Sequence, residues 1–394
     1  MASTVPDVDL TDPAVVADPF AAYAPLRERG RLARLTAPGV PAMWAVLRHE
    51  DARVMLADPR FELTANTFAL RPDVPEDCAP YLRTMQEVEG PEHLRLRRLV
   101  APAFTARRAA AFRPRLEVLV ERLLAELPRE GGAVVDLVSH FARPLPMDVI
   151  CELTGIPEAD RPRWREYGAA VAAGIGAEFG AAIPGIIEGS RKAVAARRAE
   201  PGDDLISDLI RAQAEDGDRL DDVELVTLVW NVVLAGQTPT NLIANGVSAL
   251  FENPDQLALL RAEPGLLSGA VEELTRWQGP QLLTMPRFAT QDVELAGRLV
   301  RKGDAVTVAI ASVNRDPRVF ADPDRLDVTR PATVPGHLGY AHGPHFCLGA
   351  GLARVQTEVA LSALLRAPGL APAGPARRVP DPGTWRLAEL PVTL

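Results

Sequence analysis

The sequence of 394 residues has little of what marks secreted, membrane-bound or nucleic-acid-binding proteins. It has only three cysteines, a sparse and odd set that fits a reducing cytoplasm better than a disulfide framework. It has no apolar run long enough for a transmembrane helix, and residues 1–18 lack a basic stretch followed by an apolar one. A net charge of −9 leaves no basic surplus for binding nucleic acid. We therefore expect a cytoplasmic protein without a membrane anchor, a signal peptide or a nucleic-acid partner.

The composition is otherwise that of an ordinary folded protein, with 47% hydrophobic and 24% charged residues. Helical periodicity dominates residues 115–260, and no repeat or long low-complexity linker divides the chain. The sequence therefore predicts a single domain over residues 1–394 that is mainly α with small β-sheets, an α+β fold. The expected strands are at 43–47, 293–299, 305–309 and 390–394.

The longest expected helix covers residues 222–251 and is apolar on most of its faces, which places it inside the core. Asp221 is the expected N-cap, and Glu224 three residues later completes the pattern of a capping box. Pro239 lies in the middle of this segment and has no N–H to offer the carbonyl of Ala235. We therefore expect a kink at this point and a free carbonyl on Ala235.

Cys347 stands in a loop rich in glycine and proline that runs directly into a stretch of small residues typical of a helix start. A sulfur in that position receives backbone N–H groups and the positive end of a helix dipole. Both features stabilise a thiolate relative to a thiol. The pattern therefore predicts a thiolate that acts either as a metal ligand or as a nucleophile.

The segment 340–349 resembles the cysteine loop of the cytochrome P450 family, which runs aromatic-Gly-x-Gly-x-His-x-Cys-x-Gly. In this chain Tyr340 stands where phenylalanine is usual, and Ala341 stands where the first glycine is usual. Ala341 would be strained if the turn required a positive φ angle. The residues that match the pattern are Tyr340, Ala341, Gly343, His345, Cys347 and Gly349.

The resemblance extends over nearly the whole chain and implies a P450-like fold. Its cofactor is haem b, iron protoporphyrin IX, between the long kinked helix and the helix that follows Cys347. Cys347 is the implied axial ligand of the iron, and Gly349 belongs to the same cofactor-binding loop. Cationic or polar side chains from distant parts of the chain are implied to hold the haem propionates. These side chains are His93, Arg97, Arg287 and His345.

Glu273 and Arg276 are three residues apart, so they share one face of a helix. In the family, such a pair joins an arginine further along the chain in a buried ion network that fixes the cysteine loop. The order of the motifs assigns the third position to Arg325. Removing one partner of a buried network of this kind costs about 3–5 kcal/mol.

The middle of the long helix contains the expected catalytic position, where the family has an acid followed by an alcohol. One alignment starts from Ala235, puts Thr238 in the acid position and Pro239 in the alcohol position, and needs a gap before Asn241. The other has no gap and puts Gln237 in the acid position, Thr238 in the alcohol position and Ala235 over the haem. We favour the second alignment. In both, the carboxylate is missing, so ordered water, a substrate hydroxyl or the carbonyl of Ala235 would complete the proton relay.

The resemblance implies a haem-thiolate oxidase that receives two electrons from a ferredoxin and its reductase. Arg98, Arg107 and Arg108 form either a basic docking face for an acidic ferredoxin or an ordinary solubilising surface. The residues expected to face the substrate, by their positions in the family, are Asn231, Thr284, Met285 and Trp385.

The expected substrate is a secondary metabolite, either a small molecule or a short peptide. The missing acid favours an atypical reaction, such as oxidative coupling of aromatic side chains in a peptide. Plain hydroxylation or epoxidation of a polyketide or terpenoid is the alternative. A non-catalytic relative that supports a partner enzyme ranks below both, because the ligand Cys347 is retained.

Overall fold

The computed structural model describes residues 5–67, 74–128, 134–172, 177–215, 220–332 and 334–394. Its longer helices are α1 (Pro13–Ala17), α2 (Pro19–Arg29), α3 (His49–Ala57), α4 (Gly90–Val100), α5 (Ala106–Ala111), α6 (Arg113–Ala125), α7 (Pro144–Thr154), α8 (Arg161–Ala172), α9 (Ala177–Ala199), α10 (Leu205–Glu215), α11 (Asp222–Ala235), α12 (Pro239–Glu252), α13 (Pro254–Ala262), α14 (Leu267–Gln278), α15 (Ile310–Val313) and α16 (Ala350–Arg366). Its strands are β1 (Asp7–Asp9), β2 (Leu32–Ala37), β3 (Val40–Val46), β4 (Phe61–Glu62), β5 (Val135–Asp136), β6 (Arg287–Ala289), β7 (Val293–Leu295), β8 (Arg298–Val300), β9 (Ala305–Val308), β10 (Ala371–Pro372), β11 (Arg377–Arg378), β12 (Leu387–Glu389) and β13 (Pro391–Thr393).

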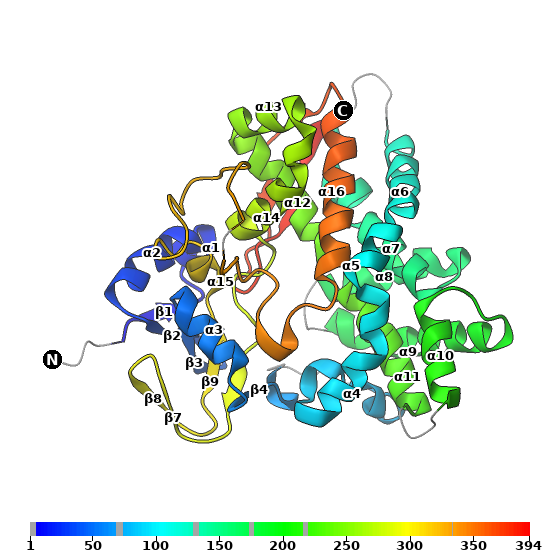
Figure 1. The fold of residues 1–394 in the computed structure, drawn as a ribbon, viewed down its shortest axis with the longest axis horizontal. Helices are drawn as coiled ribbons and strands as arrows, with labels where there is room; N and C mark the ends of the chain where they lie inside the picture. Colours follow the sequence, from blue (N-terminus) through cyan, green and yellow to red (C-terminus); the bar gives the residue numbers. More distant parts are fainter. Residues whose placement is uncertain (1–4, 68–73, 129–133, 173–176, 216–219, 333) are drawn as a thin grey trace.

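The largest sheet has six strands in the order β1-β2-β3-β9-β6-β4. Two of its pairings, β1 with β2 and β3 with β9, are parallel, and the others are antiparallel. Figure 1 shows this sheet with α1–α3 on one side of the molecule and the helices α4–α11 on the other. The expectation of a mainly α fold with small β-sheets is confirmed.

Three of the expected strands correspond to β3, β9 and β13. The expected strand 293–299 is wrong as a single strand, because Ala296 and Gly297 adopt positive φ angles of 52° and 77°. These two residues form a tight turn that divides the run into the antiparallel hairpin β7–β8.

The expected long helix forms as two helices, α11 and α12, separated by a turn at residues 236–238. Asp221 and Glu224 make both hydrogen bonds of the capping box. Pro239 begins α12, as its missing N–H requires. The carbonyl of Ala235 is not free as expected, because the Thr238 hydroxyl donates to it at 3.3 Å.

The pair α11–α12 runs through the hydrophobic core and positions the remaining elements around it. Residues 225–234 are all buried, and α12 packs against α14 and α16. Gly236 lies so close to the side chain of Ile150 in α7 that a Cβ at this position would be only 2.8 Å from it. Among the described residues, no helix combines the length and the apolar character needed to cross a membrane.

Candidate active site

Backbone contacts hold the loop that carries Cys347. Its N–H donates to the carbonyl of Tyr340 at 2.9 Å, and α16 begins three residues after it. The N–H groups of Gly349 and Ala350 lower the pKa of the thiol, as expected for a cysteine that precedes a helix. Cys347 keeps a solvent-accessible side although protein atoms surround most of it. One side of the sulfur is therefore available to a ligand.

Two opposing effects set the pKa of the Cys347 thiol. Burial is the larger effect and raises the pKa above its usual value. The N–H groups of Gly349 and Ala350 and the guanidinium groups of Arg97 and Arg354 act in the other direction. These donors stabilise the thiolate form, which is the form that ligates a metal.

The turn before Cys347 contains the strain that the sequence led us to consider. Ala341 has a φ of 60°, in the left-handed region that glycine tolerates best. For a residue with a side chain, this conformation costs roughly 1–2 kcal/mol. Gly343 has a φ of 75°, and a Cβ there would lie only 2.6 Å from the carbonyl oxygen of Leu56 in α3. The second position therefore requires glycine, whereas the first accommodates alanine under strain.

The four residues expected to hold the propionates come from α4, β6 and the cysteine loop. The rings of His93 and His345 stack with their centroids 4.0 Å apart. Arg97 donates to the carbonyl of Phe346 at 2.6 Å, directly beside Cys347. Arg287 is buried, and its guanidinium donates to a main-chain carbonyl of α3 at 2.8 Å. The fold thus gathers cationic and polar donors from three distant segments.

A carboxylate that the sequence had not indicated, Glu89, also belongs to this group. It accepts hydrogen bonds from His345 Nε2 at 2.9 Å and from the N–H of Leu63 at 2.9 Å. Burial, and to a smaller extent the neighbouring His345 and Arg97, lower the pKa of His93 to about 4, so His93 is neutral near pH 7. Glu89 directly precedes α4 and lies four residues before His93, and this spacing was the available signal, but it is common on protein surfaces.

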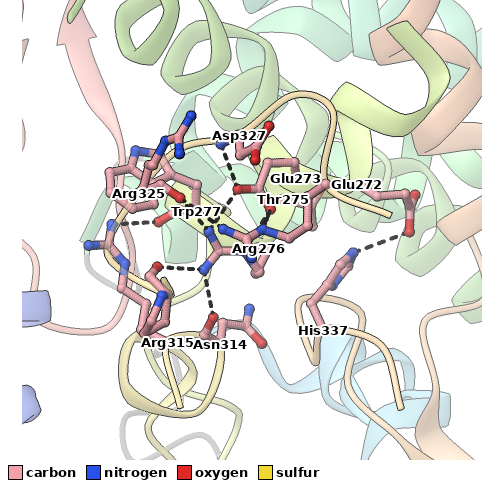
Figure 2. A network of polar contacts seen from close by, with 12 residues as sticks. Glu272, Glu273, Thr275, Arg276, Trp277, Asn314, Arg315, Arg325, Asp327 and His337 are labelled. Atoms are coloured by element: carbon pink, nitrogen blue, oxygen red, sulfur yellow. Dashed lines mark hydrogen bonds and ion pairs between the residues drawn. The ribbon is translucent and has the colours of Figure 1, made fainter. Parts of the chain in front are cut away.

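A buried ion network lies on one side of α14 (Figure 2). Arg276 donates twice to Glu273, at 2.6 and 2.8 Å, and both side chains are about 2% exposed. The third charged partner is Arg330, whose Nε lies 3.0 Å from Glu273 Oε2. The N–H of Asp327 donates to the same carboxylate at 3.0 Å. The network therefore joins α14 to the segment that leads into the cysteine loop.

The expected place of the Arg325 side chain in this network is wrong. Its side chain is exposed, and it contributes only its main-chain carbonyl, which accepts from Arg276 at 3.1 Å. The chain turns at Asp322, which has a φ of 44°, and a second turn brings Arg330 back against the carbonyls of residues 321, 322 and 325. These turns direct the side chain of Arg330, and not that of Arg325, toward Glu273.

A second acidic residue of α14, Glu272, contacts the residues on both sides of the cysteine loop. It accepts from His337 Nε2 at 3.2 Å and from Arg354 Nε at 2.5 Å. Burial opposes its ionisation, but these hydrogen bonds outweigh burial and lower its pKa to about 2. The Arg354 guanidinium also lies 4.6 Å from the centre of the Tyr340 ring. Adjacent glutamates of one helix thus hold the segment before the cysteine loop and the helix after it.

The kink between α11 and α12 presents two chemically different faces. Asn231, Ala235 and Thr238 recur at helical spacing, and the last two are exposed in the middle of the otherwise buried helix pair. Gln237 points elsewhere: its amide packs so closely on α8 that a Cβ at Gly168 would overlap it. The exposed face can meet a ligand, while Gln237 lies at the α8 side of the kink.

The other expected substrate residues differ in what they can do. Met285 is 36% exposed. The Thr284 hydroxyl accepts from the N–H of Val308 at 3.0 Å and so helps to hold the strand arrangement. Trp385 is a correction: it lies in a hydrophobic cluster, with its ring 5.2 Å from that of Phe20 in an edge-to-face contact. Its position in the family had indicated a substrate contact, but its ring packs into the core.

Comparison with known proteins identifies the family. The family described as Cytochrome P450 matches residues 179–372. Cytochrome P450 107B1 of Saccharopolyspora erythraea is 39% identical over 400 residues, which cover 98% of this chain and 96% of that protein. Cytochrome P450 monooxygenase PikC of Streptomyces venezuelae is also 39% identical, with 95% and 91% of the two chains covered. The chain belongs to the cytochrome P450 family.

Solved P450 structures share the whole architecture. The P450 monooxygenase TamI, in its structure with tirandamycin C, is 36% identical and aligns with a TM-score of 0.87 over 99% of this chain and 100% of its own. Family membership makes the chain an oxidoreductase that uses haem iron, takes electrons from a redox partner and acts on small molecules. The resemblance to the cytochrome P450 family is thereby confirmed.

The residues present fit a haem group. Cys347 offers a sulfur that is accessible on one side and supported by N–H donors, and the two histidines and two arginines form a donor set suited to a dianion. A haem ligated by thiolate supplies the cleavage of dioxygen. The donors His93, Arg97, Arg287 and His345 would orient it, and Cys347 would ligate its iron.

Proposed function

We propose that this P450 binds haem b and uses two electrons from a ferredoxin to insert an oxygen atom into a C–H or C=C bond of a polyketide-type secondary metabolite. The arrangement around Cys347 carries the oxidative part of this proposal, because it combines N–H donors, two cations and an accessible side. The substrate class rests on relatives such as 6-deoxyerythronolide B hydroxylase of Saccharopolyspora erythraea, 39% identical over 92% of this chain.

The residues of the kink then supply the polar groups on the substrate side. Thr238 has a hydroxyl on the exposed face, and Asn231 lies two helical turns before it. Neither residue titrates near neutral pH, so protons would arrive through water that these side chains position. Met285 adds an apolar contact surface for the substrate.

The ferredoxin part of the proposal rests on exposed arginines near the cysteine loop. Arg98 is exposed on α4 directly after Arg97, and Arg107 and Arg108 are exposed on α5. An acidic ferredoxin would be steered toward such a surface, and its association rate would fall as salt is added.

The proposal is tested first by the spectrum of the reduced, carbon monoxide-bound protein and then by titration of the ferric protein with macrolide-like and terpenoid-like scaffolds. A thiolate-type Soret band and a low-to-high-spin shift with these scaffolds, followed by a product that has gained one oxygen atom, are expected. A reduced spectrum without the thiolate-type band would refute the role of Cys347 and revive a non-catalytic role.

A second candidate function is oxidative coupling, favoured by the amide at Gln237 where an acid is usual. Two solved P450 structures add to this: one described as acting in C–S bond formation in chuangxinmycin biosynthesis, 32% identical, and one described as a putative thioether synthase, 36% identical. Short peptides containing tyrosine or tryptophan test this candidate. A spin shift with these peptides alone, with a product that has lost two hydrogen atoms, would favour coupling over oxygen insertion.

A further inference from the structure

A cavity of about 400 Å³ lies against the kink, and both Gln237 and Thr238 line it. It is bounded by α8, the kink between α11 and α12, the start of α7 and the segment around β12. Its apolar walls come from valine, leucine and alanine side chains. Its polar lining consists of Arg143, Gln237, Thr238, Thr240, Asn241 and Arg386.

The charge in this cavity is unbalanced. Two guanidinium groups line it, and none of the described lining residues is a carboxylate. Arg386 reaches Asp381 at 3.3 Å, outside the lining. Arg143 is half-buried and makes no side-chain ion pair or hydrogen bond within the described part of the chain. A half-buried cation without a counter-charge attracts an anion more strongly than a fully solvated one does.

The cavity also contains donors that lack acceptors. Gln237 Nε2 and Thr240 Oγ1 are buried and have no hydrogen-bond partner among the described residues. Buried polar atoms normally have partners, and each exception calls for an explanation. A carboxylate accepts several hydrogen bonds at once, so a single carboxylate could serve the amide, the hydroxyl and a guanidinium.

The missing acid explains why the imbalance occurs here. In the alignment without a gap, Gln237 occupies the position where the family has a carboxylate. Because the chain provides an amide at this point, a carboxylate from another molecule would supply the absent negative charge. We propose that the cavity binds the carboxylate group of a small molecule, with Arg143 as its charge partner and Gln237 and Thr240 as hydrogen-bond donors.

The carboxylate has two possible sources: a free small acid, or a carboxyl group of the substrate. Only the second source rests on the proposed function. Both sources would be recognised by the same side chains. This site is distinct from the ligand position at Cys347, because neither Arg143 nor Thr240 belongs to the cysteine loop.

The test is isothermal titration calorimetry of the haem-loaded protein at constant ionic strength. Acetate, hexanoate and benzoate are each compared with their uncharged amides. We expect binding of at least one carboxylate and at least tenfold weaker binding of its amide. Arg143→Gln should weaken the carboxylate at least tenfold, and Arg143→Lys, which keeps the charge, should retain most of the affinity.

Two further variants make the test specific. Gln237→Glu places a carboxylate inside the cavity, so it should abolish binding of an external carboxylate. Arg163→Gln is the matched control, because Arg163 is an exposed guanidinium of α8 that lies over Tyr167 and outside the cavity lining. It should leave the affinity unchanged. Equal binding of acids and amides, or equal affinity in wild type and Arg143→Gln, would overturn the proposal.

The ferric spectrum distinguishes the two sources. If the carboxylate belongs to the substrate, affinity should rise from acetate to hexanoate, and the longer acid should shift the spin state. If the site takes a free acid, acetate should bind as tightly as hexanoate and leave the spin state unchanged. Calorimetry does not require turnover, so a failure to form any product would count against the proposed oxidation and leave the binding result intact.

Discussion

The correction from Arg325 to Arg330 gives a decisive comparison between two arginines that are five residues apart. Arg330 is 11% exposed and donates to Glu273 and to three main-chain carbonyls. Arg325 is exposed, and only its carbonyl takes part, which a side-chain substitution leaves in place. Arg330→Gln should therefore destabilise the protein, whereas Arg325→Gln should be nearly neutral.

The magnitude follows from what Glu273 keeps in each variant. Without Arg330, its carboxylate still receives two hydrogen bonds from Arg276 and one from the N–H of Asp327. Glu273 then loses one charge-assisted hydrogen bond, which costs about 1.5–3 kcal/mol. The three carbonyls that Arg330 also serves are exposed, so water replaces its guanidinium there at little further cost. Arg276→Met leaves the carboxylate without its main partner and should cost about 3–5 kcal/mol. Arg325→Gln should lie within about 0.5 kcal/mol of wild type.

Urea unfolding of the haem-loaded variants, followed by far-ultraviolet circular dichroism, measures these differences. The expected order of destabilisation is Arg276→Met, then Arg330→Gln, then Arg325→Gln. Equal losses for Arg325→Gln and Arg330→Gln would refute the geometry of the turn at Asp322. A larger loss for Arg325→Gln would restore the assignment that the motif order suggested.

Three other predictions concern the cysteine loop and the carboxylates around it. Ala341→Gly should raise the free energy of unfolding by about 1 kcal/mol by relieving a positive φ, while Gly343→Ala should lower it, both measured in urea. Because the pKa of Glu272 is lowered from 4.5 to about 2 on folding, its ionised form stabilises the protein fully above pH 4.5, and this stability is lost as the pH falls toward 2. In Glu272→Gln, the free energy of unfolding should therefore depend less on pH in that range. Glu89→Gln replaces the charged acceptor of His345 Nε2 with a neutral amide oxygen, so it should weaken this hydrogen bond and speed haem transfer to apomyoglobin, an effect absent if Glu89 only packs.

The parts of the fold that could be predicted are those with local causes. The start of α11 follows from Asp221 and Glu224, because a capping box needs only residues three apart. The break before α12 follows from Pro239, which cannot donate inside a helix. The strain at Ala341 was likewise foreseeable, since the turn needs a positive φ whatever surrounds it.

The features that escaped sequence analysis depend on contacts between distant segments. Glu89 and Glu272 look like ordinary surface carboxylates in the sequence, and only the fold brings His345 and Arg354 to them. Trp385 was misassigned because a position within a family does not reveal the surface onto which the segment folds. Resemblance to a family indicated the order of the charged residues, but not the turns that decide which of their side chains point into the protein.

The geometry of the kink links the missing acid to the cavity. The Thr238 hydroxyl has one proton, and it is engaged with the carbonyl of Ala235 at 3.3 Å. Because Pro239 has no N–H, that carbonyl has no donor from the following helix, and Thr238 must release it before donating elsewhere. Gln237 cannot provide a replacement proton, since an amide does not titrate. A bound carboxylate beside Gln237 and Arg143 would add the one titratable group that the kink itself does not contain, so carboxylate binding and proton supply should be altered together by Gln237→Glu.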